Sequence, residues 1–297
     1  MTSTEQKELI KHTIEELSDP SSYKSLFHQL NDDDSLPSIE ALKYLVDLCR
    51  AVLFPGYFGN SRISMQTIQN HIGVNTEKLF AILKQEVHAG LCFADKRKSD
   101  CACSSLHDDA ALIAAKFISM LPEIRKTLAT DIDATYQNDP AAQNLGEVIF
   151  CYPGIRAIVN YRIAHALYTL SVPYIPRIIS EMAHSETGID IHPAAQIGSY
   201  FSIDHGTGIV IGQTSIIGNH VRLYQGVSLA GQPDSAIINR HSDQRRHPLL
   251  EDYVTVYSNA SLLGNITIGK GAIIYGNVWV SEDVAPASEI KQNVKTI

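Results

Sequence analysis

The residues of this chain best suited to chemistry are an acid and an imidazole that stand side by side, Asp204 and His205. They are followed by Gly206, Thr207 and Gly208. An imidazole can accept and return a proton near neutral pH, and a carboxylate on its far nitrogen fixes its tautomer. The segment is therefore a candidate for acid–base chemistry, although an ordinary exposed corner can carry the same pair.

A second group of polar side chains lies in the segment between Leu229 and Val254. Its basic residues are Arg240, His241, Arg245, Arg246 and His247. A long irregular segment inside a compact domain is commonly functional, and a guanidinium can bind a carboxylate through two hydrogen bonds. The group predicts an anion-binding loop, and a solvated basic cluster is its alternative.

Two more acidic residues precede prolines. Asp190 begins the run Asp-Ile-His-Pro, and Asp139 begins Asp-Pro-Ala. Both carboxylates could serve a site, but Asp190 and His192 could also cap a turn, and Asp139 could merely end a helix. We expect His165 to contribute packing, and Cys101 and Cys103 to lie in a plain loop because no second half of a metal site accompanies them.

The scaffold that must position these residues repeats every six residues from Ile189 onward. Ile191, Ile197, Ile203 and Ile209 begin the array, and it resumes after the basic loop until Pro286. Six is not a helical period, and it is typical of a parallel β-helix with one short strand and one corner per hexad. A coil of three hexads has ~18 residues, so Asp190 is expected to stack near Gly208.

Residues 1–187 carry the helical period instead. We expect a cap at Asn75 or Thr76 and an exposed loop at 95–105. The expected helices cover 38–54, 75–91, 111–136 and 154–170. The fold class is therefore α+β: an all-helical domain over 1–187, a β-helix over 188–286 with an extended loop at about 230–250, and a tail over 287–297.

Composition limits the classes of function. The chain has 297 residues, of which 44% are hydrophobic and 19% charged, and its net charge of −8 argues against wholesale nucleic-acid binding. No apolar run approaches membrane-spanning length, and the N-terminus predicts an amphipathic helix without a signal core. The cysteines are odd in number and scattered: Cys49, Cys92, Cys101, Cys103 and Cys151. This pattern fits reduced thiols, so we expect a cytosolic protein.

The motifs in combination resemble the serine acetyltransferases, within the hexapeptide-repeat acyltransferases. The resemblance covers about residues 125–285 and includes NDPAAQ, YPGIRAIVNYRIAHAL, GIDIHPAAQIGSYFSIDHGTGIVIGQT and the loop ending RRHP. It implies a left-handed β-helix, an exception to the usual right-handed crossover. It also implies a homotrimer, or a hexamer of two trimers, with active sites between neighbouring chains.

The resemblance implies a role for each matching residue. His205 would be the general base, and Asp190 would hold its ring. Asp139 and Asp204 would bind the ammonium group of L-serine, and Arg246 its carboxylate. Carboxylates at one end and a guanidinium at the other suit a zwitterion. The reaction would be direct acetyl transfer from acetyl-CoA, the first step of cysteine synthesis.

The resemblance also implies roles for His247 and for residues of an acetyl-CoA groove between adjacent β-helices. His247 would line the serine pocket, and the cofactor contacts would include Gly231, Ser258, Ala260 and Gly276. This chain departs from the common family pattern at 257–260, at Ile273 and in the tail that follows the last coil. The C-terminal Ile297 implies a possible partner, O-acetylserine sulfhydrylase, although the tail is short.

Three other functions stay open at the level of sequence. The same chemistry could act on another hydroxyl acceptor, such as homoserine or a sugar. A zinc hydratase on this scaffold would need converging histidines, which His192, His205, His220 and His247 could supply; we expect no metal, since that function would leave the Asp-Pro-Ala segment and the arginine loop without a use. A non-catalytic trimeric scaffold would keep its partner affinity without His205.

Overall fold

The computed structural model describes residues 2–27, 36–59, 62–94, 102–232 and 244–292, with the backbone alone for 102–105. The chain consists of two compact units, Met1–Ser35 and Leu36–Ile297. The expected positions Arg240, His241, Cys101 and Ile297 lie outside the described residues. No helix in the described ranges is both long and apolar enough to cross a membrane.

The first unit holds the expected amphipathic helix, α1 (Ser3–Leu17), followed by the short α2 (Pro20–Tyr23). Thr2 and Glu5 form a capping box at the start of α1, which satisfies two backbone N–H groups. The helix carries the apolar side chains of Leu9, Ile10, Ile14 and Leu17, all exposed.

Helices α3 (Ile39–Leu53), α4 (Ile68–Ala94) and α5 (Ala102–Asn138) open the second unit. Ser38 caps α3, as its position before the apolar period predicts. The expected start of the next helix at 75 is wrong, because Asn75 lies inside α4 and its Nδ2 donates to the carbonyl of His71 at 2.9 Å. The expected loop at 95–105 is also too long, since α5 already begins at Ala102 and includes Cys103.

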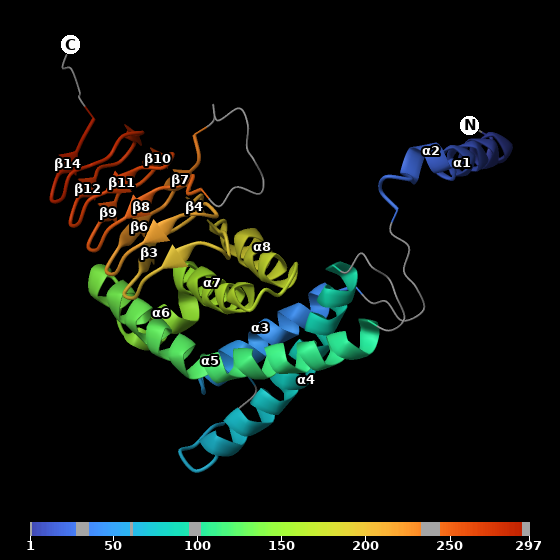
Figure 1. Ribbon diagram of the computed structural model, residues 1–297, viewed down its shortest axis with the longest axis horizontal. Helices are drawn as coiled ribbons and strands as arrows, with labels where there is room; N and C mark the ends of the chain where they lie inside the picture. The colour runs from blue at the N-terminus through green and yellow to red at the C-terminus, as the bar shows by residue number, and fades with distance from the viewer. Residues whose placement is uncertain (1, 28–35, 60–61, 95–101, 233–243, 293–297) are drawn as a thin grey trace. The chain divides into compact units, whose positions relative to one another are not determined.

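The next helices lead into the first coil of the β-helix: α6 (Leu145–Cys151), α7 (Pro153–Thr169) and α8 (Ile175–Thr187). Helix α7 confirms the helix expected over 154–170 and begins with a proline at its first turn. Most of its residues are buried, because α5 and α8 cover it on the sides and strand β3 (Ser202–Asp204) lies against it (Figure 1).

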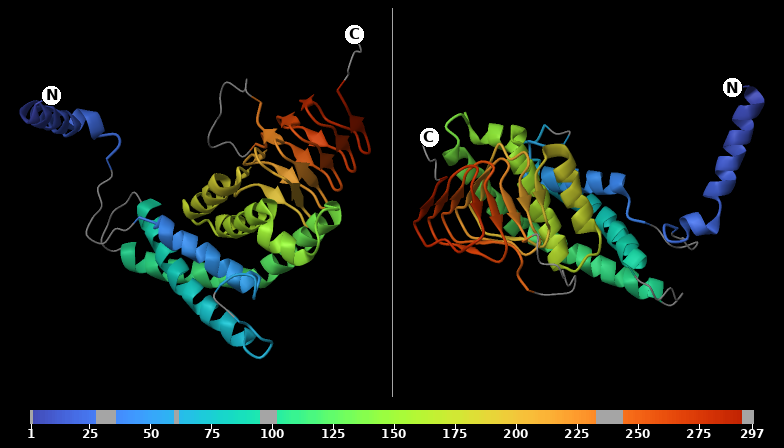
Figure 2. Two further views of the ribbon diagram at one scale, coloured as in Figure 1. Left: turned by 180° about the vertical axis from the view of Figure 1, so that it is seen from behind. Right: turned by 90° about the horizontal axis from the view of Figure 1, so that it is seen from above.

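In the described residues, fourteen short strands wind into a parallel β-helix with three sheets, which confirms the fold class predicted from the hexads (Figures 1 and 2). The sheet orders are β1-β4-β7-β10-β13, β2-β5-β8-β11 and β3-β6-β9-β12-β14. Besides β3, the strands are β1 (Asp190–Ile191), β2 (Gln196–Ile197), β4 (Val210–Ile211), β5 (Ile216–Ile217), β6 (Arg222–Tyr224), β7 (Ser228–Ala230), β8 (Leu249–Leu250), β9 (Thr255–Val256), β10 (Ser261–Leu263), β11 (Thr267–Ile268), β12 (Ile273–Ile274), β13 (Trp279–Val280) and β14 (Glu289–Ile290).

The register corrects one expectation. Asp190 pairs with Val210, not with Gly208, and Ile203 pairs with Leu223. The first coil therefore holds two residues more than three hexads. The extra pair lies in the corner after β3, the corner that contains His205.

The far end of the β-helix also differs from the hexad count. Strand β14 pairs with β12, although its residues follow Pro286 and fall in the segment expected to be tail. The division into a helical domain over 1–187 and a β-helix domain over 188–286 stays a prediction.

The first coil has no coil beneath it, and helices satisfy its carbonyl groups instead. Arg162 of α7 donates to the carbonyls of Ile197 and Gly198, both at 2.6 Å. The Tyr161 hydroxyl donates to Ala195 O at 2.6 Å, and Nδ1–H of His165 donates to Pro193 O at 2.8 Å. The sequence expectation that His165 packs is consistent with this contact.

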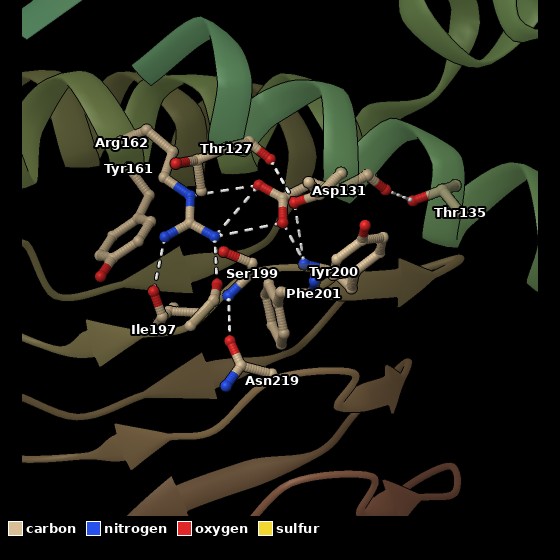
Figure 3. Close-up of polar contacts among 12 residues, drawn as sticks. Thr127, Asp131, Thr135, Tyr161, Arg162, Ile197, Ser199, Tyr200, Phe201 and Asn219 are labelled. Atoms are coloured by element: carbon tan, nitrogen blue, oxygen red, sulfur yellow. Dashed lines mark hydrogen bonds and ion pairs between the residues drawn. The ribbon is translucent and has the colours of Figure 1, made fainter. Parts of the chain in front are cut away.

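Asp131 of α5 completes this junction (Figure 3). It is fully buried, forms an ion pair with Arg162 at 3.1 Å and accepts a hydrogen bond from the Phe201 N–H at 3.0 Å. Thr130 accepts another from Tyr200 N–H at 3.0 Å. The start of β3, which leads directly to Asp204 and His205, is thus fixed to α5.

Candidate active site

The corner after β3 presents His205 to solvent. His205 has a φ of +58°, and Gly206 and Gly208 follow with φ of +93° and +81°. A Cβ on Gly206 would come within 2.5 Å of Ile189, so this position requires glycine. The two extra residues of the coil thus push the His205 side chain outward, where it is 75% exposed with Nε2 3.6 Å from Asp204 Oδ1.

A small hollow beside this corner brings the two expected ammonium-binding carboxylates together. Asp139, at the end of α5, and Asp204, at the end of β3, both line it. Asn138 donates to the Ser202 hydroxyl at 3.0 Å, which holds the end of α5 against β3. Residues far apart in the sequence therefore form one acidic site.

Asp139 is held in its ionised form by hydrogen bonds. The Tyr152 hydroxyl donates to its Oδ2 at 2.6 Å, and the Ala141 N–H donates to its Oδ1 at 2.8 Å. These donors lower the pKa of Asp139, with smaller contributions from Arg222 and His205. The same hydrogen bond to Asp139 raises the pKa of Tyr152 to about 12, so Tyr152 stays a donor.

Arg222 is a residue of this site that the sequence analysis missed. Its Nη2 donates to Asp204 Oδ2 at 2.6 Å, and its guanidinium lies 4.6 Å from the Tyr224 ring centroid. Arg222 reaches this site because β3 pairs with β6, which places Arg222 beside Ser202 and Tyr224 beside Asp204. An uninterrupted hexad count gives a different register for these two strands, so it does not place Arg222 near Asp204.

Asp190 does not contact His205 in the described chain. Both residues are described, and no hydrogen bond or ion pair joins them. Asp190 instead lies with Glu181 and His184, whose potential ligand atoms are all within 4.8 Å of one another. The corner is nevertheless adjacent, because Asp190 N–H donates to Ile209 O at 2.9 Å. The expected dyad stays a prediction that requires the His205 ring to turn.

Arg246 and His247 are held against the corner before β5. The Thr214 hydroxyl oxygen accepts the backbone N–H of Arg246 at 2.8 Å and of His247 at 3.1 Å. The Thr214 N–H donates to Nδ1 of His247 at 3.2 Å, so its ring proton resides on Nε2. Arg246 Nη2 donates to Gln213 at 3.1 Å.

Two histidines near this loop are kept neutral. Burial, together with the positive charge of Arg246, lowers the pKa of His247 to about 4. Burial also lowers the pKa of His192 to about 4, aided by Arg177, His247 and Arg246. His192 Nδ1 accepts a hydrogen bond from the Ala194 N–H at 3.1 Å. His192 therefore caps a turn, which is the alternative that the sequence analysis left open for it.

The two expected halves of the serine pocket lie apart within one chain. The hollow that contains Asp139 and Asp204 is lined by neither Arg246 nor His247, both of which the structure describes. The acidic half belongs to the sheet of β3 and β6, and the basic half lies on the sheet of β5 and β8. One chain therefore offers two incomplete halves.

The expected cofactor residues occupy different environments. Ser258 and Gly276 are adjacent on neighbouring coils, since a Cβ on Gly276 would lie 3.0 Å from Ser258 O. Gly231 faces the basic loop, with Arg246 O 3.6 Å from its would-be Cβ. Ala260 is completely buried, and its contact with the cofactor stays a prediction.

A coil of paired two- and three-residue parallel strands, with an exposed histidine at a widened corner, is the architecture of a hexapeptide-repeat protein. No protein-family model matches the chain. A Synechococcus elongatus protein named "Serine acetyltransferase, plasmid" is 43% identical over 270 residues, which are 89% of this chain and 85% of that protein. The chain belongs to the serine acetyltransferase family.

Solved structures agree with this assignment. Serine acetyltransferase isoform 3 of Entamoeba histolytica, solved in complex with cysteine, matches at a TM-score of 0.72 and 29% identity, over 93% of this chain and 91% of that chain. Serine acetyltransferase 1 of the same organism, solved with L-cysteine, matches at 0.71 and 35% identity, over 89% and 91%. The resemblance stated from the sequence is confirmed.

Proposed function

We propose that this chain transfers the acetyl group of acetyl-CoA to the hydroxyl of L-serine, giving O-acetyl-L-serine and CoA. The observation that carries the proposal is His205, exposed on a widened corner beside a hollow lined by Asp139 and Asp204. Membership of the serine acetyltransferase family supports this activity as the first step of cysteine synthesis.

His205 acts as the general base. Its Nε2 takes the proton of the serine hydroxyl while the oxygen attacks the thioester carbonyl. When the tetrahedral intermediate collapses, the carbon–sulfur bond breaks and the imidazolium returns the proton to the departing sulfur. Transfer is direct, and no acyl-enzyme forms. Asp190 stabilises the imidazolium once the ring turns toward β1.

The two half-sites recognise the two ends of the zwitterion. Asp139 and Asp204 bind the ammonium group, and Arg246 binds the carboxylate with His247 beside it. Because one chain keeps these halves apart, we propose that they complete each other between neighbouring chains of a homotrimer, or of a hexamer built from two trimers. Neutral His247, with its proton on Nε2, is suited to donate a hydrogen bond there.

Acetyl-CoA is proposed to lie in the groove between adjacent β-helices, near Gly231, Ser258 and Gly276. The proposed reaction uses no metal ion. We also propose that the protein acts in the cytosol, a setting that the free thiols of Cys49 and Cys151 support. Binding of the sulfhydrylase through Ile297 remains a separate proposal.

The test is the release of free CoA thiol from acetyl-CoA in the presence of L-serine, L-homoserine or a sugar acceptor. Release with L-serine, at a kcat/KM well above that with the other acceptors, is the expected result. Release only with another hydroxyl acceptor would reassign the substrate, and no release with any acceptor would end the enzymatic proposal.

A further inference from the structure

Arg222 lies at the wall of the acidic hollow, in strand β6 beside β3. Its side chain is 21% exposed and that of its partner Asp204 is 19% exposed. The charge-assisted hydrogen bond between them, at 2.6 Å, is therefore partly desolvated. The guanidinium also lies over the ring of Tyr224, which restricts where it can move.

A contribution to folding stability does not by itself explain why Arg222 lies at the wall of the hollow. The Nε–H of Arg222 is buried and has no hydrogen-bond partner among the described residues. A buried donor without a partner costs about 1–3 kcal/mol. Such a group in a functional hollow calls for an explanation in terms of what the charge does there.

The charge faces two carboxylates that share one small space. Asp139 and Asp204 line the hollow together with Arg222 and Tyr152. Two neighbouring carboxylates ordinarily repel each other, so that one of them keeps its proton to a higher pH. Arg222 places a positive charge beside Asp204, which offsets this repulsion.

The other titratable groups around the hollow come from several elements. Tyr152, at the start of α7, donates to Asp139, and Glu147 of α6 lies near Tyr152. His205 follows β3, and Tyr224 lies on β6. Among these groups Arg222 is the one that is always positively charged, and it adds to the lowering of the pKa of Asp139.

We propose that Arg222 is a positioning residue for the amino-acid substrate: its guanidinium holds Asp204 in place beside Asp139, so that the hollow matches one ammonium group. This inference rests on the proposed function, because it assigns the ammonium of serine to that hollow. Its consequence is that loss of the guanidinium weakens the affinity for serine and leaves the affinity for acetyl-CoA unchanged.

The experiment measures KM for L-serine, KM for acetyl-CoA and kcat between pH 6 and pH 8.5 for the wild type, R222M and R222K. Methionine keeps the aliphatic stem of the side chain without the charge or the donors, and lysine keeps the charge without the planar fork. In R222M we expect KM for serine to be about 5- to 10-fold above wild type across this pH range, with kcat within a few fold of wild type, since Asp204 then loses the charge-assisted hydrogen bond that holds it. In R222K, which can still donate to Asp204, KM for serine stays within about 3-fold of wild type.

The two proposals fail in different ways. If the wild type releases no CoA with serine, the proposed function fails before Arg222 is considered. If the wild type is active and R222M keeps the wild-type KM for serine, the inference about Arg222 is overturned. An unchanged KM for acetyl-CoA and an unchanged thermal midpoint show that R222M is folded; should R222M unfold, R222Q is measured on the same criteria.

Discussion

The Tyr152 hydroxyl donates a hydrogen bond of 2.6 Å to Asp139 Oδ2, which ties the residue before α7 to the residue after α5. Through this bond a carboxylate that no regular element holds is aimed into the hollow beside His205. We predict that Tyr152→Phe raises KM for serine about 5- to 10-fold with little change in kcat, because one net hydrogen bond to a charged group is worth about 1.5 kcal/mol. An unaltered KM for serine would show that Asp139 needs no such support.

The contact between Gly212 and His247 gives a second prediction. A Cβ on Gly212 would overlap the imidazole of His247. We expect Gly212→Ala to displace that ring and to raise KM for serine by about tenfold or more, with a thermal midpoint lowered by several degrees.

The matched control for this substitution is Gly73→Ala in helix α4, where a Cβ would meet nothing within 4 Å. That change should leave catalysis unaltered and stabilise the helix by about 0.5–1 kcal/mol. Equal effects of the two substitutions on KM for serine would refute a special role for Gly212.

The buried ion pair Asp131–Arg162 gives a third prediction, on stability. Asp131→Ala leaves a buried guanidinium without its carboxylate and removes the acceptor of Phe201 N–H. We expect the free energy of unfolding in urea to fall by about 3–5 kcal/mol. The exposed pair Lys126–Glu123, at 3.1 Å, is the control, and Glu123→Ala should change stability by less than about 0.5 kcal/mol. A loss no larger than the control's would mean that the junction does not depend on this pair.

The neutral histidines predict how stability depends on pH. In the unfolded chain a histidine has a pKa of about 6.5, whereas His192 and His247 have values of about 4 in the folded protein. Between these values the unfolded state binds protons that the folded state does not, so the free energy of unfolding falls as the pH is lowered through this window. We expect a loss of about 1 kcal/mol per histidine between pH 7 and pH 5, after allowance for their partial exposure.

Urea unfolding of the wild type and of His192→Gln at both pH values checks this. The variant should lose less stability than the wild type on acidification. Parallel losses in the two proteins would contradict the assignment of a depressed pKa to His192.

The hexad period predicted the β-helix correctly because buried β-branched side chains must repeat with each strand. The period failed at the corner after β3, where two added residues shift the register. Ile203 and Ile209 therefore belong to different rows, although they are still six positions apart. That same shift exposes His205 and brings Arg222 beside Asp204. The period therefore predicted the scaffold and missed the geometry at the site.

Other misses have local causes. Asparagine is a common helix cap, but α4 continues on both sides of Asn75, and the side-chain amide of Asn75 donates a hydrogen bond within the helix. The buried role of Arg162 in the YRIAH helix could not be predicted from spacing, because its partners are carbonyl groups of the first coil and a carboxylate of α5. Such pairs depend on how helices meet the β-helix.

The central claim is that the His205 imidazole removes the proton from the serine hydroxyl, and the most direct test is the steady-state rate of CoA release by His205→Asn. Asparagine keeps a polar side chain at this left-handed position but cannot accept the proton. We predict a fall in kcat of about 100- to 10,000-fold, with KM for both substrates within a few fold of wild type. A variant that retains the wild-type kcat would contradict the account.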